Sequence, residues 1–354
     1  MEREVMHRVQ GEEPRKFTTN RVAITCKMLF SMFFLSSLVM PQCANAKDNE
    51  GYDFYVKPSA SYYSIKLPDY APMALRLTGA IGSGFLHYLP TIGNKDNSIL
   101  SEFTIGIEEK KKKIFYEIKG FDHSSSSNGN NIFDYSTDYR VGYFPIDGST
   151  SSIGLGLGDD FVVSTSRDFE HKGLELISGI PYEVNKNTTF YTLIGYSHIS
   201  IDQSFTTHAY ELQTPSNTMD LDESIKGTYH GATIGFKLES LQKSYSTYFT
   251  GTYSRYRASL KYTGKQKDTI VVPMDIDREL SKSKWVKQVK LEAGISKKIS
   301  KKWTLDLTAG LSFLDVPQIT ASTKSSAFNE GEPNSIGFDK SRSVKFGVGV
   351  TYRF

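Results

Sequence analysis

The chain ends in SVKFGVGVTYRF, Ser343 to Phe354, and this stretch decides the fold. Successive side chains of a β-strand point to opposite faces. If the stretch is a strand, its apolar face consists of Phe346, Val348, Val350, Tyr352 and Phe354. The opposite face consists of Lys345, Gly347, Gly349, Thr351 and Arg353. The sequence therefore predicts an amphipathic last strand that needs an apolar environment on one side only.

The same alternation recurs along the chain, for example from Trp303 to Phe313 and from Ala232 to Leu238. Polar links that are short enough for hairpin turns lie near 109–113, 145–150, 184–187, 239–243 and 296–301. Longer polar stretches lie at about 67–99, 122–130, 164–172, 201–226, 263–283 and 317–342. If the long stretches are loops, the connections join about twelve strands, with ten or fourteen as alternative counts. The fold class predicted is all-β: an antiparallel up-and-down barrel.

The N-terminal part has the pattern of an export signal. Basic residues extend to Lys27, an apolar core runs from Met28 to about Met40, and an A-x-A cleavage site follows at Ala44 to Ala46. We therefore expect a signal peptide over residues 1–46 and a barrel domain over 47–354. Cleavage would remove both cysteines of the chain, and it would lower the formal net charge from +3 to +1. These values exclude a disulfide scaffold and give no electrostatic basis for binding nucleic acid.

A soluble β-sandwich also alternates, because it buries one face of each sheet. Glycine, threonine and charged residues share the polar faces here, as they do in the lumen of a barrel, and Trp285 and Trp303 lie at predicted strand ends. The apolar core of the leader is shorter than the roughly 20 residues that a transmembrane helix needs, and the rest of the chain has no longer apolar run. A membrane-spanning barrel is thus favoured over a sandwich.

In this respect the sequence resembles bacterial outer-membrane β-barrel proteins, many of which end on an aromatic residue preceded by apolar residues at alternate positions. The resemblance implies an outer-membrane location in a Gram-negative bacterium. It also implies that outer-membrane lipid and the barrel-assembly machinery are partners, the latter recognising Phe346, Val348, Val350, Tyr352 and Phe354. The ring is expected to close by pairing this last strand with a first strand around Tyr52, Phe54 and Val56.

The polar faces predict a charged interior. The residues expected to line it are Glu102, Glu117, Lys119, Asp134, Asp138, Arg140, Lys237, Glu239, Lys290, Glu292, Asp306 and Arg353. Charges of both signs across a confined space fit a porin-like channel for small polar solutes. They equally fit a salt-bridge network that fills the interior and serves stability. The sequence leaves both interpretations open.

Two other functions are compatible with the sequence. A surface scaffold would bind an external ligand through the long polar stretches. A lipid hydrolase would use the segment Phe121 to Asn131, which is weakly similar to the His-x-Ser-Asn-Gly signature of outer-membrane phospholipases through His123, Ser125, Asn128 and Gly129. Because the spacing differs and no orienting residue is evident, a non-enzymatic function is expected. The sequence shows no motif for a metal or an organic cofactor, and we expect neither.

Overall fold

The computed structural model describes residues 51–77, 86–89, 91–133, 139–143, 146–147, 153–154, 161–269, 274–320 and 333–354. The expected signal peptide and the side chains of Asp134 and Asp138 lie outside these residues. In the described part of the chain, no helix is long and apolar enough to cross a membrane.

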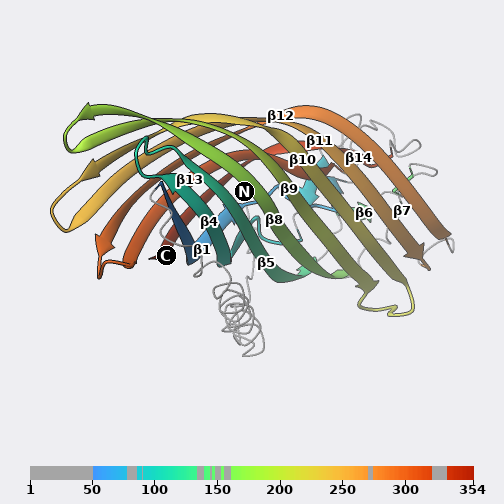
Figure 1. Cartoon of the computed structure of the whole chain (residues 1–354). Helices are drawn as coiled ribbons and strands as arrows, with labels where there is room; N and C mark the ends of the chain where they lie inside the picture. The colour runs from blue at the N-terminus through green and yellow to red at the C-terminus, as the bar shows by residue number, and fades with distance from the viewer. Residues whose placement is uncertain are drawn as a thin grey trace, which may run out of the picture. The chain divides into compact units, whose positions relative to one another are not determined.

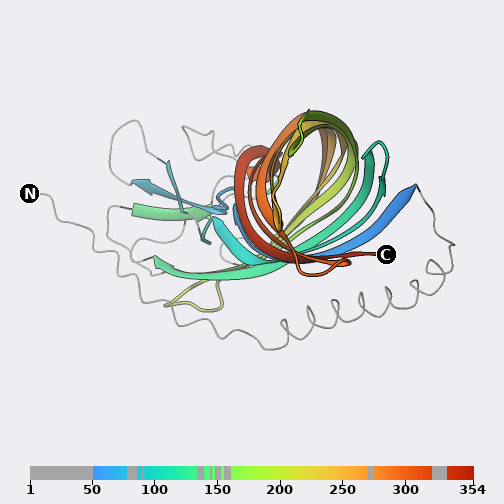
Figure 2. The same cartoon turned by 60° about the vertical axis from the view of Figure 1, so that its left-hand side comes forward.

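Ten strands close into an antiparallel barrel, which confirms the predicted fold class (Figure 2). The strands of the ring are β1 (Tyr52–Lys66), β4 (Lys95–Glu109), β5 (Phe115–Phe133), β8 (Phe161–Asn185), β9 (Thr188–Glu211), β10 (Thr218–Leu241), β11 (Tyr245–Asp268), β12 (Met274–Lys298), β13 (Trp303–Thr320) and β14 (Ser335–Arg353). Each pairs with the next, and β14 pairs with β1. The count is ten rather than the twelve that regular alternation of connections suggests.

The last strand closes the ring as predicted. β14 pairs with β1 in a register that sets Tyr352 opposite Val56 and Phe346 opposite Tyr62. The backbone N–H of Phe354 donates to the carbonyl oxygen of Phe54 over 3.0 Å. Because the two edge strands satisfy each other, neither leaves a row of unpaired backbone groups in the membrane.

The two ends of the barrel differ. Four tight connections, β4–β5, β8–β9, β10–β11 and β12–β13, lie at one end together with the start of β1 and the end of β14 (Figure 1). We call this the turn end, and the opposite end the loop end. In outer-membrane barrels short turns face the periplasm, so in a barrel of that class we expect the loop end to be the extracellular one.

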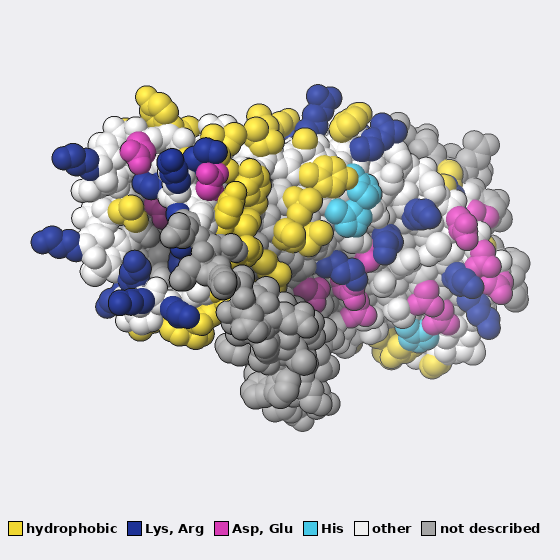
Figure 3. Space-filling model, in the orientation of Figure 1, with side chains coloured by type: hydrophobic (Ala, Val, Ile, Leu, Met, Phe, Trp, Pro, Cys, Tyr) yellow, Lys and Arg dark blue, Asp and Glu magenta, His cyan; other side chains and the backbone are white. Residues whose placement is uncertain are grey.

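Nearest the turn end, the outward side chains form an apolar band. Ile194, Ile234, Leu307 and Phe346 are each more than half exposed, and they belong to four different strands. In Figure 3 apolar side chains gather around the middle of the barrel, with charged side chains toward both of its ends. The band spans about eleven residues of β9, from Thr188 to His198, which matches the length of a tilted transmembrane strand.

Beyond the band, toward the loop end, polar side chains point outward and apolar side chains point inward. On β9 the outward residues become Ser200, Asp202, Ser204 and Thr206, while the buried inward residues become Ile199, Ile201 and Phe205. The reversal explains why 122–130, 164–172, 201–226 and 263–283, predicted as loops, are largely strand in their described residues: many of their outward side chains are polar and face water. Of the predicted loop 317–342, residues 317–320 and 335–342 are strand. We call this water-exposed part of the barrel the extension. The inward apolar side chains of the extension pack together and form its core.

The core of the extension fills its interior. The residues of its two buried clusters are Tyr63, Ile65, Leu67, Tyr70, Ile92, Leu100, Phe121, Phe169, Ile199, Ile201, Phe205, Ile225, Tyr229, Tyr256, Ala258, Leu260, Tyr262, Val286, Leu314, Val316, Ile319 and Ile336. They come from the barrel strands and from the segment that follows β1. Burial of this apolar surface stabilises the extension in the way that it stabilises a soluble domain.

Four short strands form a second sheet outside the ring. These are β2 (Met73–Leu77), β3 (Leu86–Leu89), β6 (Tyr139–Tyr143) and β7 (Ile153–Gly154), in the order β3-β2-β6-β7. The predicted barrel hairpin around 145–150 was therefore wrong, because strands of five and two residues cannot cross a bilayer. Arg140 lies on β6, opposite Arg76, and is not a residue of the barrel wall. Figure 1 places β6 and β7 toward the loop end.

Candidate functional site

The interior of the membrane-spanning half contains a polar cavity of about 670 Å³. The cavity reaches the turn end, since Gln242 and Lys301 belong to its lining. Eight of the residues predicted to line the interior contribute to its wall: Glu117, Lys119, Lys237, Glu239, Lys290, Glu292, Asp306 and Arg353. Glu102 is also inward and buried, just above the cavity.

A network of ion pairs crosses the cavity where it meets the extension. Glu102 accepts from Lys119 at 2.6 Å and from Lys345 at 3.2 Å, and Lys345 also contacts Glu292 at 2.6 Å. Lys290 forms an ion pair with Glu175. The network joins β4, β5, β8, β12 and β14 across the barrel. Since each carboxylate has a cation beside it, burial of these charges is compensated.

Nearer the turn end, the paired groups leave open space between them. Lys57 lies 3.6 Å from Asp306, Arg353 lies 3.1 Å from Glu108, and Tyr55 donates to Glu117 over 2.6 Å. The predicted set lacked Tyr55, Lys57, Glu108, Glu175 and Lys345. Glu175 was missed because the adjoining stretch 164–172 was taken for a loop, which concealed the long strand β8. The alternation of faces could have identified the other four, because Lys345 shares a face with Arg353 and Glu108 shares a face with Glu102.

Two glycines of the inner face make room for aromatic rings. A methyl group at Gly106 would overlap the ring of Tyr55, and one at Gly179 would overlap the ring of Phe115. Each ring belongs to the neighbouring strand and covers the glycine from the side. Glycine on these faces is therefore partly a packing requirement.

Above the ion-pair network the interior is closed by apolar packing. Phe169, Ile199, Tyr229 and Val316 are completely buried, and they come from β8, β9, β10 and β13. The ring of Tyr229 packs edge-on against Tyr256 at 6.1 Å between centroids. The cavity thus ends at a packed layer that spans the barrel.

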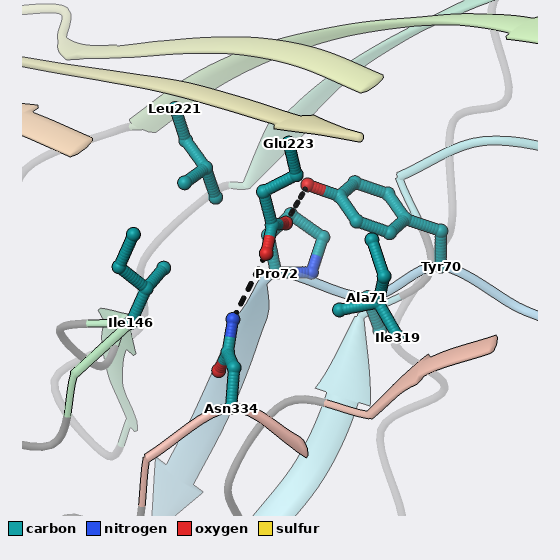
Figure 4. A pocket seen from close by; sticks show the side chains of 8 residues that line it. All are labelled: Tyr70, Ala71, Pro72, Ile146, Leu221, Glu223, Ile319 and Asn334. Carbon is teal, nitrogen blue, oxygen red and sulfur yellow. Dashed lines mark hydrogen bonds between the residues drawn. The ribbon is translucent and has the colours of Figure 1, made fainter. Parts of the chain in front are cut away.

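A buried carboxylate in the extension, that of Glu223, is bound by Tyr70 and Asn334, which lie outside the barrel strands (Figure 4). Tyr70 donates to one oxygen of Glu223 over 2.6 Å, and Tyr262 and Asn334 donate to the other over 2.6 Å and 3.0 Å. Asn334 also donates its backbone N–H to the carbonyl of Ile146. These groups lie in the extension, outside the apolar band, where burial raises the pKa of Glu223 and the pKa of Tyr70. We call this cluster the Glu223 knot.

The segment considered for hydrolase chemistry is strand rather than loop. His123 and Ser125 face the interior and are buried, while Asn128 faces outward, so the three side chains do not converge. His123 lies directly opposite His171 on β8. In the described part of the chain the hydroxyl of Ser125 has no hydrogen-bond partner. In this segment Ser125 and His123 therefore do not form a hydrogen-bonded Ser–His pair.

No family model and no curated protein matches the chain. Solved structures that match include the Escherichia coli outer membrane protease OmpT, with 10% identity, TM-score 0.46, and 85% of this chain and 97% of that chain covered. The Neisseria meningitidis NalP translocator domain matches with 10% identity and TM-score 0.32, and the match covers 94% of this chain and 99% of that chain. The Pseudomonas putida toluene transporter TodX matches with 9% identity and TM-score 0.30, and the match covers 87% of this chain and 91% of that chain. At these values none of their activities is carried over.

The closed ring, the apolar outer band and the charged interior define the chain as an outer-membrane β-barrel protein. Its long strands are divided between the apolar band and the extension. About half of β9 spans the apolar band, and the other half forms the extension.

Proposed function

We propose that the chain is a non-conducting outer-membrane barrel that presents its extension to ligands outside the cell. The observation that carries this proposal is the packed layer above the cavity, in which Phe169, Ile199 and Tyr229 are completely buried. A barrel that conducts at rest needs a continuous water-filled path, and interior packing of this kind leaves none.

The extension supports the same proposal. A membrane crossing needs only about ten residues per strand, yet the strands from β8 to β12 have 24 or 25. The part of these strands that exceeds a membrane crossing is exposed to water. It has a wide polar surface and an exposed hairpin tip at Leu212. Scaffolds that bind through their surface need such area, whereas a simple pore does not. The proposal includes no catalytic activity.

Planar-bilayer recording of the purified chain tests the closed interior. We expect no conductance steps, because the apolar layer blocks ion flow. Regular steps of one size from the unmodified protein would contradict the proposal and favour a porin.

Surface binding is tested separately with cells that display the chain over an array of immobilised glycans and matrix proteins. The matched variant has residues 212–217 replaced by a Gly-Ser linker of the same length. We expect a ligand captured by the parent to be lost in this variant. Capture that survives the replacement, or no capture by the parent, would argue against binding at the extracellular tip.

A second candidate is a channel that opens when the segments that contain Tyr70 and Asn334 move. The charged cavity and the Glu223 knot favour it, because the knot joins β10 and β11 to Tyr70 and Asn334, which lie outside the barrel strands. Replacement of Glu223 by Ala would remove the acceptor that three buried donors share. If this channel exists, Glu223→Ala conducts and the parent does not, while the exposed neighbour Asp222→Ala stays closed. If none of the three proteins conducts, the gated-channel candidate is wrong.

A further inference from the structure

Two histidines face each other on the outer surface of the barrel, at the border between the apolar band and the extension. His198 on β9 and His230 on β10 are directly opposed in the strand register, and both side chains are exposed. Their Nδ1 atoms lie 3.0 Å apart and their ring centroids 4.4 Å apart. Histidine side chains form a patch beside the apolar band in Figure 3.

We propose that His198 and His230 form a binding site for a divalent transition-metal ion of the Cu²⁺ or Ni²⁺ type. Two nitrogens that each bind a metal at about 2.05 Å lie about 2.9 Å apart when they are at right angles, and about 3.4 Å apart in a tetrahedron. The observed 3.0 Å is therefore close to the separation of two neighbouring ligands in a square-planar or octahedral site.

The sheet supplies the stiffness that such a site needs. Both histidines lie in the middle of long strands that pair without interruption from Thr188 to Tyr210 on β9. The imidazoles are therefore held side by side before any metal arrives, and the chain loses little freedom on binding. The phenol oxygen of Tyr196 lies 3.4 Å from Nδ1 of His230, at the same site.

The remaining coordination positions face solvent. Among the described residues no group of three or more histidine, cysteine or carboxylate side chains is arranged to hold a metal ion. The site therefore has two protein ligands, and water completes the shell, so the ion exchanges readily. Imidazole is a ligand of intermediate softness that suits copper, nickel and zinc, with copper bound most tightly of the three.

Other histidine contacts in the barrel differ in ways that serve as controls. His123 and His171 are also directly opposed, but they are buried inside the barrel among aromatic rings. His208 is exposed and opposed by Asp220, whose carboxylate lies 2.6 Å away. Replacement of His208 leaves the proposed site intact and removes a histidine from the same surface.

The test is calorimetric titration of Cu²⁺ into the chain without the expected signal peptide, residues 47–354, in lipid nanodiscs and without a histidine tag. We expect one equivalent to bind, and binding to weaken at least tenfold in His198→Ala and in His230→Ala but not in His208→Ala. Electron paramagnetic resonance of bound Cu²⁺ should show coupling to two imidazole nitrogens in the parent. Unchanged affinity in both alanine variants, or no saturable binding by the parent, would overturn the proposal. Gel mobility before and after heating identifies any variant that is not folded, and for such a position His→Asn replaces His→Ala.

Discussion

A lysine placed at two outward positions of β9 should cost very different amounts of free energy. Ile194 lies in the apolar band, with Ile234 directly opposite, and is 54% exposed. Thr206 lies in the extension, with Asp222 directly opposite. The two positions are twelve residues apart on one face, which is about 40 Å along the strand and about 28 Å in height at a tilt of 45°.

The expected magnitudes follow from these surroundings. A lysine facing lipid costs about 2–4 kcal/mol at the bilayer midplane and about 0–1 near the interface. Ile194 has an apolar cross-strand neighbour on β10, so Ile194→Lys should lose close to the full amount. Thr206→Lys gains about 0.2–1 kcal/mol from the opposed carboxylate of Asp222 and faces water, so its cost should be near zero.

The assay is reversible unfolding from lipid vesicles in guanidinium chloride, followed by the emission of Trp285 and Trp303. The slope of the transition should stay the same, and only the midpoint should move. Equal free-energy losses at the two positions, or a neutral Ile194→Lys, would refute the assignment of the band to lipid and of the extension to water.

Three further predictions concern the knot, the chain end and the interior. Glu223→Ala should lower the free energy of unfolding by about 1–3 kcal/mol, because three buried donors lose the acceptor that they share, whereas exposed Asp222→Ala should change little. Burial raises the pKa of Glu223, so the native state binds this proton more tightly than the unfolded chain. The parent should therefore lose stability as pH rises from about 4.3, the ordinary pKa of glutamate, through the raised pKa of Glu223. Glu223→Gln should lack that loss. Identical dependence of stability on pH in guanidinium titrations of the two proteins would contradict this. Deletion of Phe354 should reduce the amount of chain inserted in the outer membrane without altering the folded barrel, and normal surface yield would be the contrary result. Gly106→Ala should lower the free energy of unfolding by about 1–3 kcal/mol by displacing Tyr55 from its packing position, with Gly93→Ala as an open-space control, and equal stability of the two variants would disprove the packing role.

The sequence predicted the membrane-spanning half of the barrel well, because the period of two in β13 and β14 is unambiguous there. Phe346 and Leu307 had to face lipid, and Lys345 and Asp306 had to face inward, once the ring was closed. Pairing of β14 with β1 followed from the need to satisfy every backbone group in the bilayer.

The extension could not be predicted in the same way. In the membrane the outward side chains of a strand are apolar, whereas in water the outward side chains are polar. Asp202, Ser204 and Thr206 look like a loop when apolar side chains are expected to point outward, yet they are the solvent face of a strand whose core side carries Ile201 and Phe205. The twelve-strand count arose from this reversal and from the short strands β6 and β7, which pair outside the ring.

The candidate sites depend on strand register, which no local pattern contains. His198 and His230 are 32 positions apart in the chain, and only the β9–β10 pairing brings their nitrogens together. Glu223 sits in a stretch predicted as a loop, and its donors Tyr70, Tyr262 and Asn334 come from three distant segments. Long-range pairing of this kind becomes visible only in the folded barrel.

The most direct test of the account is a spin-label scan along the outward face of β9 in bilayers, at alternate positions from 190 to 210. Collision rates are measured with oxygen, which concentrates in lipid, and with a water-soluble nickel complex. We predict that oxygen dominates up to Tyr196 and the nickel complex dominates from Ser200 onward, with the change at His198. A profile that favours the nickel complex along the entire strand would show that the apolar band does not contact lipid, and would contradict a membrane-spanning barrel.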